Sequence, residues 1–414
     1  MNILFVSDVS ISRIIGGAER VLYEQSIRLA KKGHNVHVLT RLLTDHSSSH
    51  EIIQDVHEWR YDVDQSSDLS FFYSSTRNCK TLYESLKKDN TFNILNFHQP
   101  FSSFGVLKSR ADKDTKKVYT CHSLSFEEYQ SRNLKPRGLI QKIRYGLNVQ
   151  GRKRIEGKVL RSSDRIIVLS TYTRDKLLNQ YGIQPDKIVL IPGGVDLERF
   201  RPARNRIDVR KHLGLSEHTI NLLTVRNLVP RMGLDNLIHA MADVVHQIPD
   251  VHLVIGGSGP LKKDYSRLVE KLGLGRFIRF DGFIPEDRLP DYYSAADLFV
   301  LPTLELEGFG LVTLEALATG TPVVGTPIGG TREILGTLDS RFLFKGTDRS
   351  SIASLIVEMC RDFKDDPSLW RRMSNQCRTF AEEHFSWQRN VDATEKVFLE
   401  EIQTHERDSR SSLS

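Results

Sequence analysis

The sequence predicts an α/β protein that consists of two doubly wound parallel sheets. Short apolar runs alternate with longer segments of helical periodicity through most of the 414 residues, and connections of that length are typical of parallel strands. The alternation stops at a run rich in Pro and Gly, 192–202, and starts again near Ile220. We therefore predict an N-terminal domain at 1–191, a linker at 192–216 and a C-terminal domain at 217–385.

The N-terminal domain is predicted to open with a strand, a glycine loop and an amphipathic helix. The strand covers 3–7, Gly16 and Gly17 close the loop, and the helix ends at Gly33. Since glycines ahead of a helix suit an anion, Gly16 and Gly17 are candidate ligand contacts, with a simple turn as the alternative. The polar stretch 44–50 favours a loop or an insertion. Further strands are predicted at 35–40, 93–98, 117–121 and 165–170.

The C-terminal domain repeats this alternation. Its predicted strands cover 220–225, 251–256, 277–280, 298–302 and 322–326, and the segments between them have helical periodicity. The last segments of the chain are also helical, and they include 386–405. The polar end of the chain, 406–414, is predicted to be a disordered tail.

The motif EGFGLVTLE, which runs from Glu307 to Glu315, is the strongest site signal. It reads as a loop followed by a helix that begins near Gly310. Gly308 and Gly310 let a ligand approach the backbone, and the start of the helix offers free N–H groups to a phosphate. Glu307 and Glu315 would then both lie near one ligand. An isolated pair of glutamates with turn glycines would be weak evidence, so the flanking sequence decides.

Together with its flanks, the motif resembles the signature of the retaining nucleotide-sugar glycosyltransferases of family four, which have the GT-B fold of two Rossmann-like domains. The flanks DGFIPEDRLPDYYSAADLFVLPTLE and ALATGTPVVGTPIGGTRE are similar to the family's pattern almost position by position. The resemblance implies transfer of a sugar from a nucleoside-diphosphate donor to a hydroxyl acceptor, with retained anomeric configuration. The acceptor implied is a glycan or a lipid-linked glycan of cell-surface polysaccharide biosynthesis. The helix at 386–405 is implied to cross back to the N-terminal domain.

The resemblance also implies roles for individual residues. Glu307 would contact sugar hydroxyls, and Glu315 would accept from the ribose. Phe283 and Ile284 would hold the base mostly through backbone contacts, and Gly257 would lie at the edge of the nucleotide site. Donor contacts are also implied for the residues of the two glycine loops, Gly16, Gly17, Gly308, Phe309 and Gly310.

Two histidines follow predicted strands of the N-terminal domain. His122, in VYTCHSLSFEEY, matches the histidine that faces the transferred sugar in this family, and it is the second catalytic candidate beside Glu307. His98, in NFHQP, could line the acceptor side. Doubly wound sheets bind ligands at the carboxyl ends of their strands. For both histidines a structural role is the alternative, and for His98 the two readings are about equally supported.

One motif departs from the family. Where the family has an arginine and a lysine that hold the donor diphosphate, this chain reads VRNLVPRMG, with Asn227 and Met232 at those positions. Arg226 and Arg231 stand next to them and could supply the charge that a diphosphate needs. If they do not, the alternative is a non-catalytic sugar-nucleotide-binding or regulatory subunit of a glycosyltransferase complex.

No metal and no other cofactor are expected. The D-x-D triplets at 62–64 and 112–114 resemble metal motifs of a different glycosyltransferase fold, but such triplets are common by chance, and the second lies in a charged run. The cysteines show neither disulfide nor zinc spacing, so we expect reduced thiols. They are Cys79, Cys121, Cys360 and Cys377.

The formal net charge of +6 indicates an anionic partner. Nucleic acid is not expected, because no nucleic-acid-binding motif is found. In the segment 131–161 many bases accompany a single acid, Glu156, and apolar residues are interleaved. One hypothesis is that this segment rests on an anionic membrane surface, and a solvated helix is the alternative. With neither signal peptide nor membrane span predicted, we expect a cytoplasmic protein that can associate with the inner face of the membrane.

Overall fold

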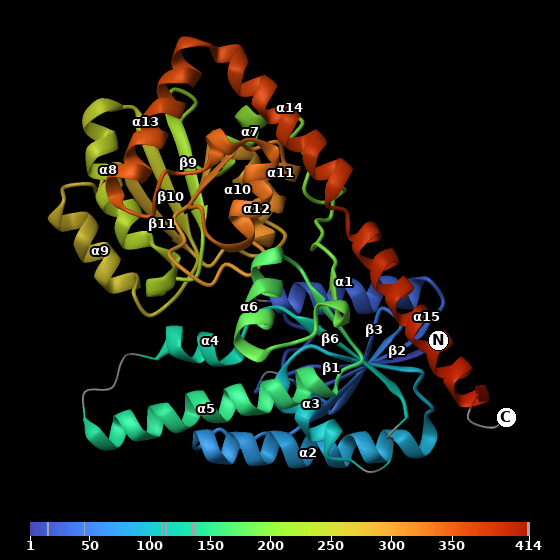
Figure 1. Cartoon of the computed structure of the whole chain (residues 1–414). Helices are drawn as coiled ribbons and strands as arrows, with labels where there is room; N and C mark the ends of the chain where they lie inside the picture. Colours follow the sequence, from blue (N-terminus) through green and yellow to red (C-terminus); the bar gives the residue numbers. More distant parts are fainter. Residues whose placement is uncertain (15, 45, 110, 112–113, 134–137, 412–414) are drawn as a thin grey trace. The chain divides into compact units, whose positions relative to one another are not determined.

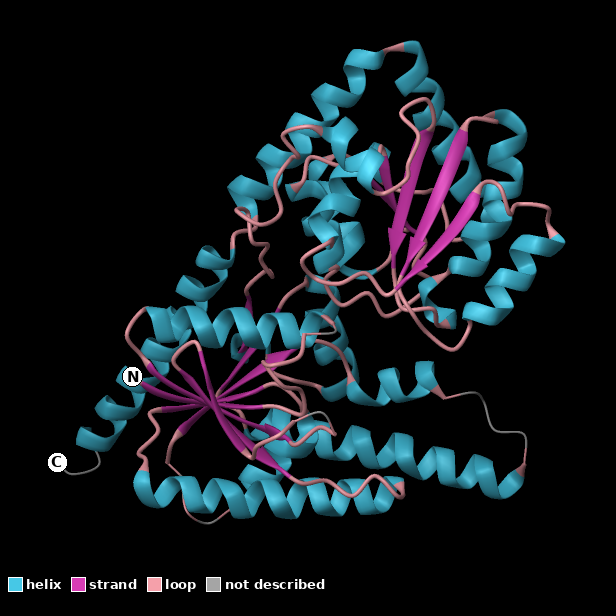
Figure 2. Ribbon diagram, turned by 180° about the vertical axis from the view of Figure 1, so that it is seen from behind, coloured by secondary structure: helices cyan, strands magenta, loops and turns pink. Residues whose placement is uncertain are grey.

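The computed structural model describes residues 1–14, 16–44, 46–109, 111, 114–133 and 138–411. The chain divides into two compact units. Unit 1 comprises Met1–Gly193 and Trp387–Ser414, and unit 2 comprises Gly194–Ser386. Each unit is built on one sheet that helices cover (Figures 1 and 2).

Unit 1 contains an eight-stranded sheet with the order β3-β4-β2-β1-β5-β6-β7-β8. Its strands are β1 (Asn2–Val6), β2 (Asn35–Arg41), β3 (His50–Ile53), β4 (Val56–Tyr61), β5 (Ile94–Phe97), β6 (Lys116–Cys121), β7 (Arg165–Val168) and β8 (Ile188–Leu190). Neighbouring strands pair in parallel except β3 with β4. The chain order switches at β1, which lies between β2 and β5, and doubly wound sheets bind ligands at such a point.

Helices cover both faces of this sheet, as Figure 2 shows from behind. Successive residues of β1 point to opposite faces. Leu4 packs in a core with α2 (Asp68–Asp89), α3 (Pro100–Leu107), α5 (Leu139–Ser162) and α6 (Thr171–Tyr181). Phe5 packs in a second core with α1 (Gly17–Lys31) and α15 (Trp387–Ser411). Unit 1 also contains α4 (Ser125–Arg132) and the 3-10 turn η1 (Pro185–Lys187).

Unit 2 contains a parallel sheet with the order β11-β10-β9-β12-β13. Its strands are β9 (Ile220–Val225), β10 (Val251–Gly256), β11 (Ile278–Gly282), β12 (Leu298–Leu301) and β13 (Val323–Gly325). Its helices are α7 (Arg206–His212), α8 (Leu234–Gln247), α9 (Lys262–Lys271), α10 (Leu289–Ala295), α11 (Leu311–Ala318), α12 (Gly329–Leu338), α13 (Arg349–Asp365) and α14 (Pro367–His384), with the 3-10 turns η2 (Pro230–Met232) and η3 (Ser340–Phe342).

Three segments differ from the sequence expectation. The polar insertion leads into the hairpin β3-β4, whose turn residues Gln54 and Asp55 have φ of 45° and 66°. Within the expected linker, 192–216, residues 206–212 form α7, which is held to unit 2 because Arg210 forms an ion pair with Asp297 at 2.6 Å. The expected tail is helical to Ser411, where α15 ends, and its last residues lie outside the described part of the chain.

The last helix, α15, belongs to unit 1, where it packs on α1 (Figure 1). The contact is polar as well as apolar. Gln25 of α1 donates through Nε2 to Asn390 Oδ1 at 3.0 Å, and Asn390 Nδ2 donates to the carbonyl of Pro192 at 2.7 Å. The chain thus returns to unit 1 at Trp387.

Candidate functional site

The carboxyl edge of the sheet in unit 2 brings together residues that are far apart in the sequence. Arg226 follows β9 directly, and Gly257 follows β10. Thr303 and Glu307 lie in the loop after β12, and β12 is the neighbour of β9. Parallel strands end at one edge, so these residues meet where doubly wound folds bind ligands.

Glu307 is held by a buried arginine. Its side chain is 11% exposed and that of Arg226 is 5% exposed. One guanidinium nitrogen of Arg226 donates to Glu307 Oε2 and to the hydroxyl of Thr303, and that hydroxyl lies 3.1 Å from the same carboxylate oxygen. Arg226 Nε is buried and has no hydrogen-bond partner in the described structure. The site therefore contains an ion-paired guanidinium whose buried Nε–H has no partner in the described structure.

Backbone geometry fixes the loop that carries Glu307. Gly330 N–H donates to the carbonyl of Glu307 at 3.0 Å. Gly329 has φ +56°, and a Cβ there would lie 1.9 Å from the same carbonyl oxygen. Gly310, with φ +91°, directly precedes the first residue of α11. A side chain at Gly329 would displace Glu307.

Two buried hydroxyls lie beside Gly310 and were not singled out by the sequence. A Cβ at Gly310 would be 3.1 Å from Thr313 Oγ1 and equally far from Thr331 Oγ1. Neither hydroxyl has a hydrogen-bond partner in the described structure. Buried hydroxyls are usually paired, so these two are candidate donors to a ligand at the start of α11. No motif signal could have found them, because Thr is common in such segments.

Glu315 lies one turn into α11 and is also buried. Its Oε2 accepts a hydrogen bond of 2.8 Å from Tyr293. Burial, and then the charge of Glu315, raise the pKa of that phenol well above its ordinary value, so Tyr293 stays a donor. The carboxylate predicted to bind ribose is thereby held in a fixed orientation. Phe309, between the two glutamates, is buried and lies 6.1 Å from the ring of Phe385.

The residues expected to hold the base lie at the end of β11. Gly257 N–H donates to the carbonyl of Gly282 at 2.6 Å, and a Cβ at Gly257 would lie 1.9 Å from the carbonyl of Arg226. Phe283 is 59% exposed, whereas Ile284 is buried against Gly256. The side chain of Ile284 is therefore not available to a ligand.

Arg231, the second arginine that could replace the family's cations, contacts the backbone beside Glu307. Arg231 is half-buried and donates to the carbonyl of Leu306 at 3.1 Å, immediately before Glu307. Asn227 is exposed, and Met232 is buried and 6% exposed. The structure places Arg226 against Glu307 and leaves the predicted contact of both arginines with a diphosphate as a prediction.

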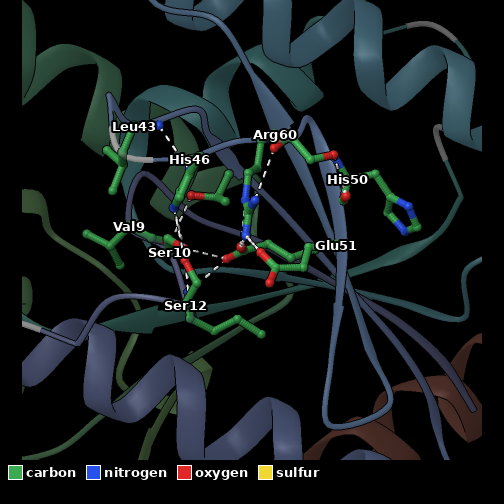
Figure 3. Close-up of polar contacts among 12 residues, drawn as sticks. Val9, Ser10, Ser12, Leu43, His46, His50, Glu51 and Arg60 are labelled. Carbon is green, nitrogen blue, oxygen red and sulfur yellow. Dashed lines mark hydrogen bonds and ion pairs between the residues drawn. The ribbon is translucent and has the colours of Figure 1, made fainter.

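In unit 1 the loop that leads to Gly16 is tethered to the sheet, as Figure 3 shows. Glu58 of β4 is buried and accepts from Ser10 Oγ at 2.7 Å and from the N–H of Ile11 at 2.8 Å. Arg60 Nε donates to the same carboxylate at 2.8 Å. His46 contacts Ser12 Oγ at 2.9 Å. The hairpin β3-β4 and the loop before it thus shape the segment after β1.

The glycine pair itself is exposed at the start of α1. A carboxylate oxygen of Glu19, in the first turn, would lie 3.2 Å from a Cβ at Gly16. Burial raises the pKa of Glu19 above its ordinary value. Gly17 is the first residue of α1.

His122 and His98 meet at the ends of the neighbouring strands β6 and β5. His122 Nε2 lies 3.0 Å from His98 Nδ1. Burial lowers the pKa of His122 to about 4 and that of His98 well below its ordinary value. Both rings are therefore neutral at physiological pH. The two remaining ring nitrogens are buried and have no hydrogen-bond partner in the described structure.

The D-x-D triplets and the cysteines are the remaining titratable motifs. Asp62 and Asp64 are exposed, and the triplet at 112–114 lies partly outside the described residues. Among the side chains that the structure describes, no cluster of His, Cys, Asp and Glu could hold a metal. The cysteines are free and buried, at positions 79, 121, 360 and 377.

Two family models match the chain. The model for Glycosyltransferase Family 4 matches residues 15–199, and the model for Glycosyl transferases group 1 matches residues 205–379. The chain is 32% identical over 265 residues to a D-inositol 3-phosphate glycosyltransferase of Streptomyces avermitilis, in a match that covers 62% of this chain and 56% of that protein. It is 30% identical over 255 residues to a GDP-mannose-dependent alpha-(1-6)-phosphatidylinositol monomannoside mannosyltransferase of Mycolicibacterium smegmatis, covering 60% and 64%.

Solved structures show the same fold over nearly the whole chain. Sucrose-phosphate synthase from Thermosynechococcus elongatus superposes with a TM-score of 0.82 and covers 97% of this chain and 99% of that one. At 23% identity this likeness concerns the fold. The two doubly wound units therefore have the GT-B architecture, as the sequence predicted.

Proposed function

This chain belongs to family four of the glycosyltransferases, and we propose that it transfers a sugar from a nucleoside-diphosphate donor to a hydroxyl acceptor with retention of anomeric configuration. The observation that carries the proposal is the buried contact of Arg226 with Glu307 and Thr303 at the carboxyl edge of the sheet in unit 2. The mannosyltransferase relative is named as GDP-mannose-dependent, which supports a donor of this class.

In the proposed reaction, unit 2 binds the donor and unit 1 supplies the acceptor side. Glu307 positions the sugar through its hydroxyls, and Glu315 accepts from the ribose. The leaving diphosphate takes the proton of the acceptor hydroxyl, while Arg226 and the N-terminus of α11 stabilise the charge that develops on it. His122 is neutral, so it can form a hydrogen bond with the sugar without adding charge to the site.

A donor panel tests the proposal. Purified chain is mixed with UDP-, GDP- and ADP-sugars, and both nucleotide-diphosphate binding and nucleotide release are measured. We expect at least one donor to be used, and Glu307→Gln to lose release while it keeps nucleotide binding. Glu305→Gln is the matched control, because Glu305 is an exposed carboxylate of the same loop. Equal turnover in the two variants would remove Glu307 from the mechanism.

We further propose that the acceptor is a glycan or lipid-linked glycan reached at the inner face of a membrane. The first half of α5 exposes four apolar side chains, and their exposed fractions are 75% for Leu139, 83% for Ile140, 56% for Ile143 and 69% for Leu147. Exposed bases flank them, and no described helix is long and apolar enough to span a bilayer. An apolar stripe with flanking bases suits an anionic bilayer surface.

Vesicle co-sedimentation distinguishes this surface from a solvated helix. We expect binding at low salt to vesicles with phosphatidylglycerol and weaker binding to neutral vesicles. The double variant Ile140→Ser with Ile143→Ser should bind both kinds of vesicle more weakly, whereas Lys142→Gln should reduce only the preference for anionic lipid. Equal and weak binding to both vesicle types by the unmodified chain would favour the solvated helix.

A second reading is a non-catalytic subunit that binds sugar nucleotides. The observation that favours it is the absence of a cation at positions 227 and 232, where Asn227 and Met232 stand. The donor panel separates the two readings. Binding of nucleotide diphosphate without release from any donor would support the subunit.

A further inference from the structure

The loop that bears His122 ends on a buried carboxylate of α5. Glu156 is fully buried. Its Oε1 accepts the N–H of Ser125 at 2.9 Å, and its Oε2 accepts the hydroxyl of Tyr181. Ser125 is the first residue of α4, three positions after His122. Glu156 therefore joins three helices, α4, α5 and α6, at the point where the His122 loop becomes helical.

The loop has few other anchors. Cys121 closes β6, Leu124 is buried, and the hydroxyl of Ser123 donates to Glu128. The hydroxyl of Ser125 is buried and has no hydrogen-bond partner in the described structure. Loss of the contact between Ser125 N–H and Glu156 would leave the first turn of α4 without its side-chain acceptor.

A buried carboxylate such as Glu156 is unusual as a purely structural hydrogen-bond acceptor, because no cation forms an ion pair with it in the described part of the chain. The charged and titratable groups that face it are Tyr181 and, farther off, Glu127 and Glu128 of α4 and Tyr119 and Cys121 of β6. Lys176 of α6 is engaged with Glu127 at 2.5 Å. An isolated buried carboxylate is costly, so a neutral residue would serve packing better.

We infer that Glu156 is a positioning residue for His122. The ionised carboxylate of Glu156 fixes the start of α4 and thereby the loop that connects β6 to α4. This inference rests on the proposed function only through the role of His122 in sugar binding. Burial raises the pKa of Glu156 to about 7, whereas the hydrogen bonds from Tyr181 and Ser125 lower it. Both hydrogen bonds are therefore stronger when Glu156 is ionised, and the loop is held best above pH 7.

The inference predicts that the ring resonance of His122 shifts in a step as the pH passes through about 7. His122 itself titrates near pH 4, so a change in its ring resonance near neutrality must come from a neighbour. The resonance is followed in protein labelled with [13C]histidine and is assigned by its loss in His122→Gln. We expect the step in the unmodified chain and its absence in Glu156→Gln. Tyr181→Phe should move the midpoint upward, because a hydrogen bond that favours the ionised form is lost.

Donor turnover supplies the second readout. Glu156→Gln should lower kcat about tenfold with little change in KM for the donor, and it should remove the component of the kcat profile that rises through pH 7. Absence of the His122 step from the unmodified chain, or its persistence in Glu156→Gln, would overturn the inference. If neither the unmodified chain nor any variant turns over a donor, but the His122 resonance shows the expected step, the result would count against the proposed function and support the positioning role.

Discussion

The contact of Arg226 with Glu307 gives the most specific quantitative prediction. The two side chains meet across 81 positions of sequence and are 5% and 11% exposed. Replacing Arg226 by Met keeps the aliphatic stem and removes the charge, which leaves Glu307 buried with Thr303 as its remaining donor. Replacing Glu307 by Gln removes the opposite charge and leaves Arg226 buried.

The size of the effect follows from burial. Removal of one partner from a buried ion pair costs about 3–5 kcal/mol. Thr303 continues to donate, and Glu307 retains some solvent access, so we expect the lower end, about 3 kcal/mol, for Arg226→Met. The double variant Arg226→Met with Glu307→Gln should cost less than the sum of the single changes by about 2 kcal/mol, because it leaves no unpaired charge.

The assay must report unit 2 separately, because a chain of two units need not unfold in one step. Trp370, in α14, is the tryptophan of unit 2, and the other two tryptophans belong to unit 1. We propose urea unfolding followed by the fluorine resonance of 5-fluorotryptophan at Trp370. Arg276→Met is a matched control, because Arg276 is an exposed arginine of the same unit.

Additive losses would refute this reasoning. If the double variant lost as much as the two single variants together, Arg226 and Glu307 would not be energetically coupled. The buried charge pair would then not be the feature that holds Glu307 in the site. An effect of Arg226→Met no larger than that of Arg276→Met would have the same meaning.

Three further predictions concern proton linkage, metal and backbone. Between pH 4.5 and about 7, Glu156 keeps its proton in the native chain and has lost it in the unfolded chain. The free energy of unfolding should therefore fall by about 3 kcal/mol as the pH rises through that window. Urea titrations at several pH values can check this, and the free energy of unfolding of Glu156→Gln should change less with pH. Nucleotide release should persist in excess EDTA, and its loss with recovery on added manganese would contradict a metal-independent reaction. Gly329→Ala should destabilise unit 2 by about 2 kcal/mol or more and abolish release, whereas Gly336→Ala, whose Cβ would be 3.7 Å from its nearest neighbour, should be close to neutral in the same urea assay.

The parallel sheets could be predicted because their strands are buried and apolar. Val323–Gly325 and Leu298–Leu301 lie inside the predicted strands, and the two-fold repetition of the pattern gave two units. The hairpin β3-β4 was missed because its strands carry buried charge at Glu58 and Arg60, and because its turn has left-handed residues without glycine. Periodicity cannot identify a strand whose inward positions are polar.

The candidate site was predictable as a set of residues and not as a set of contacts. Glycines at positive φ and a glutamate loop after a strand are visible in the sequence. The direction of the Arg226 side chain is not, because it depends on which strand lies beside β9 in the sheet. Glu156 was visible only as the single acid among many bases, and its burial against Ser125 and Tyr181 depends on the packing of three helices.

Retention of configuration is the central mechanistic claim, and the first sugar anomer released by the chain tests it most directly. A donor accepted in the panel is incubated with the chain in the absence of an acceptor, so that water takes the sugar slowly. Proton NMR then identifies the anomer before mutarotation equilibrates it. Our account predicts that an α-linked donor gives the α anomer first. Initial release of the β anomer would contradict the account.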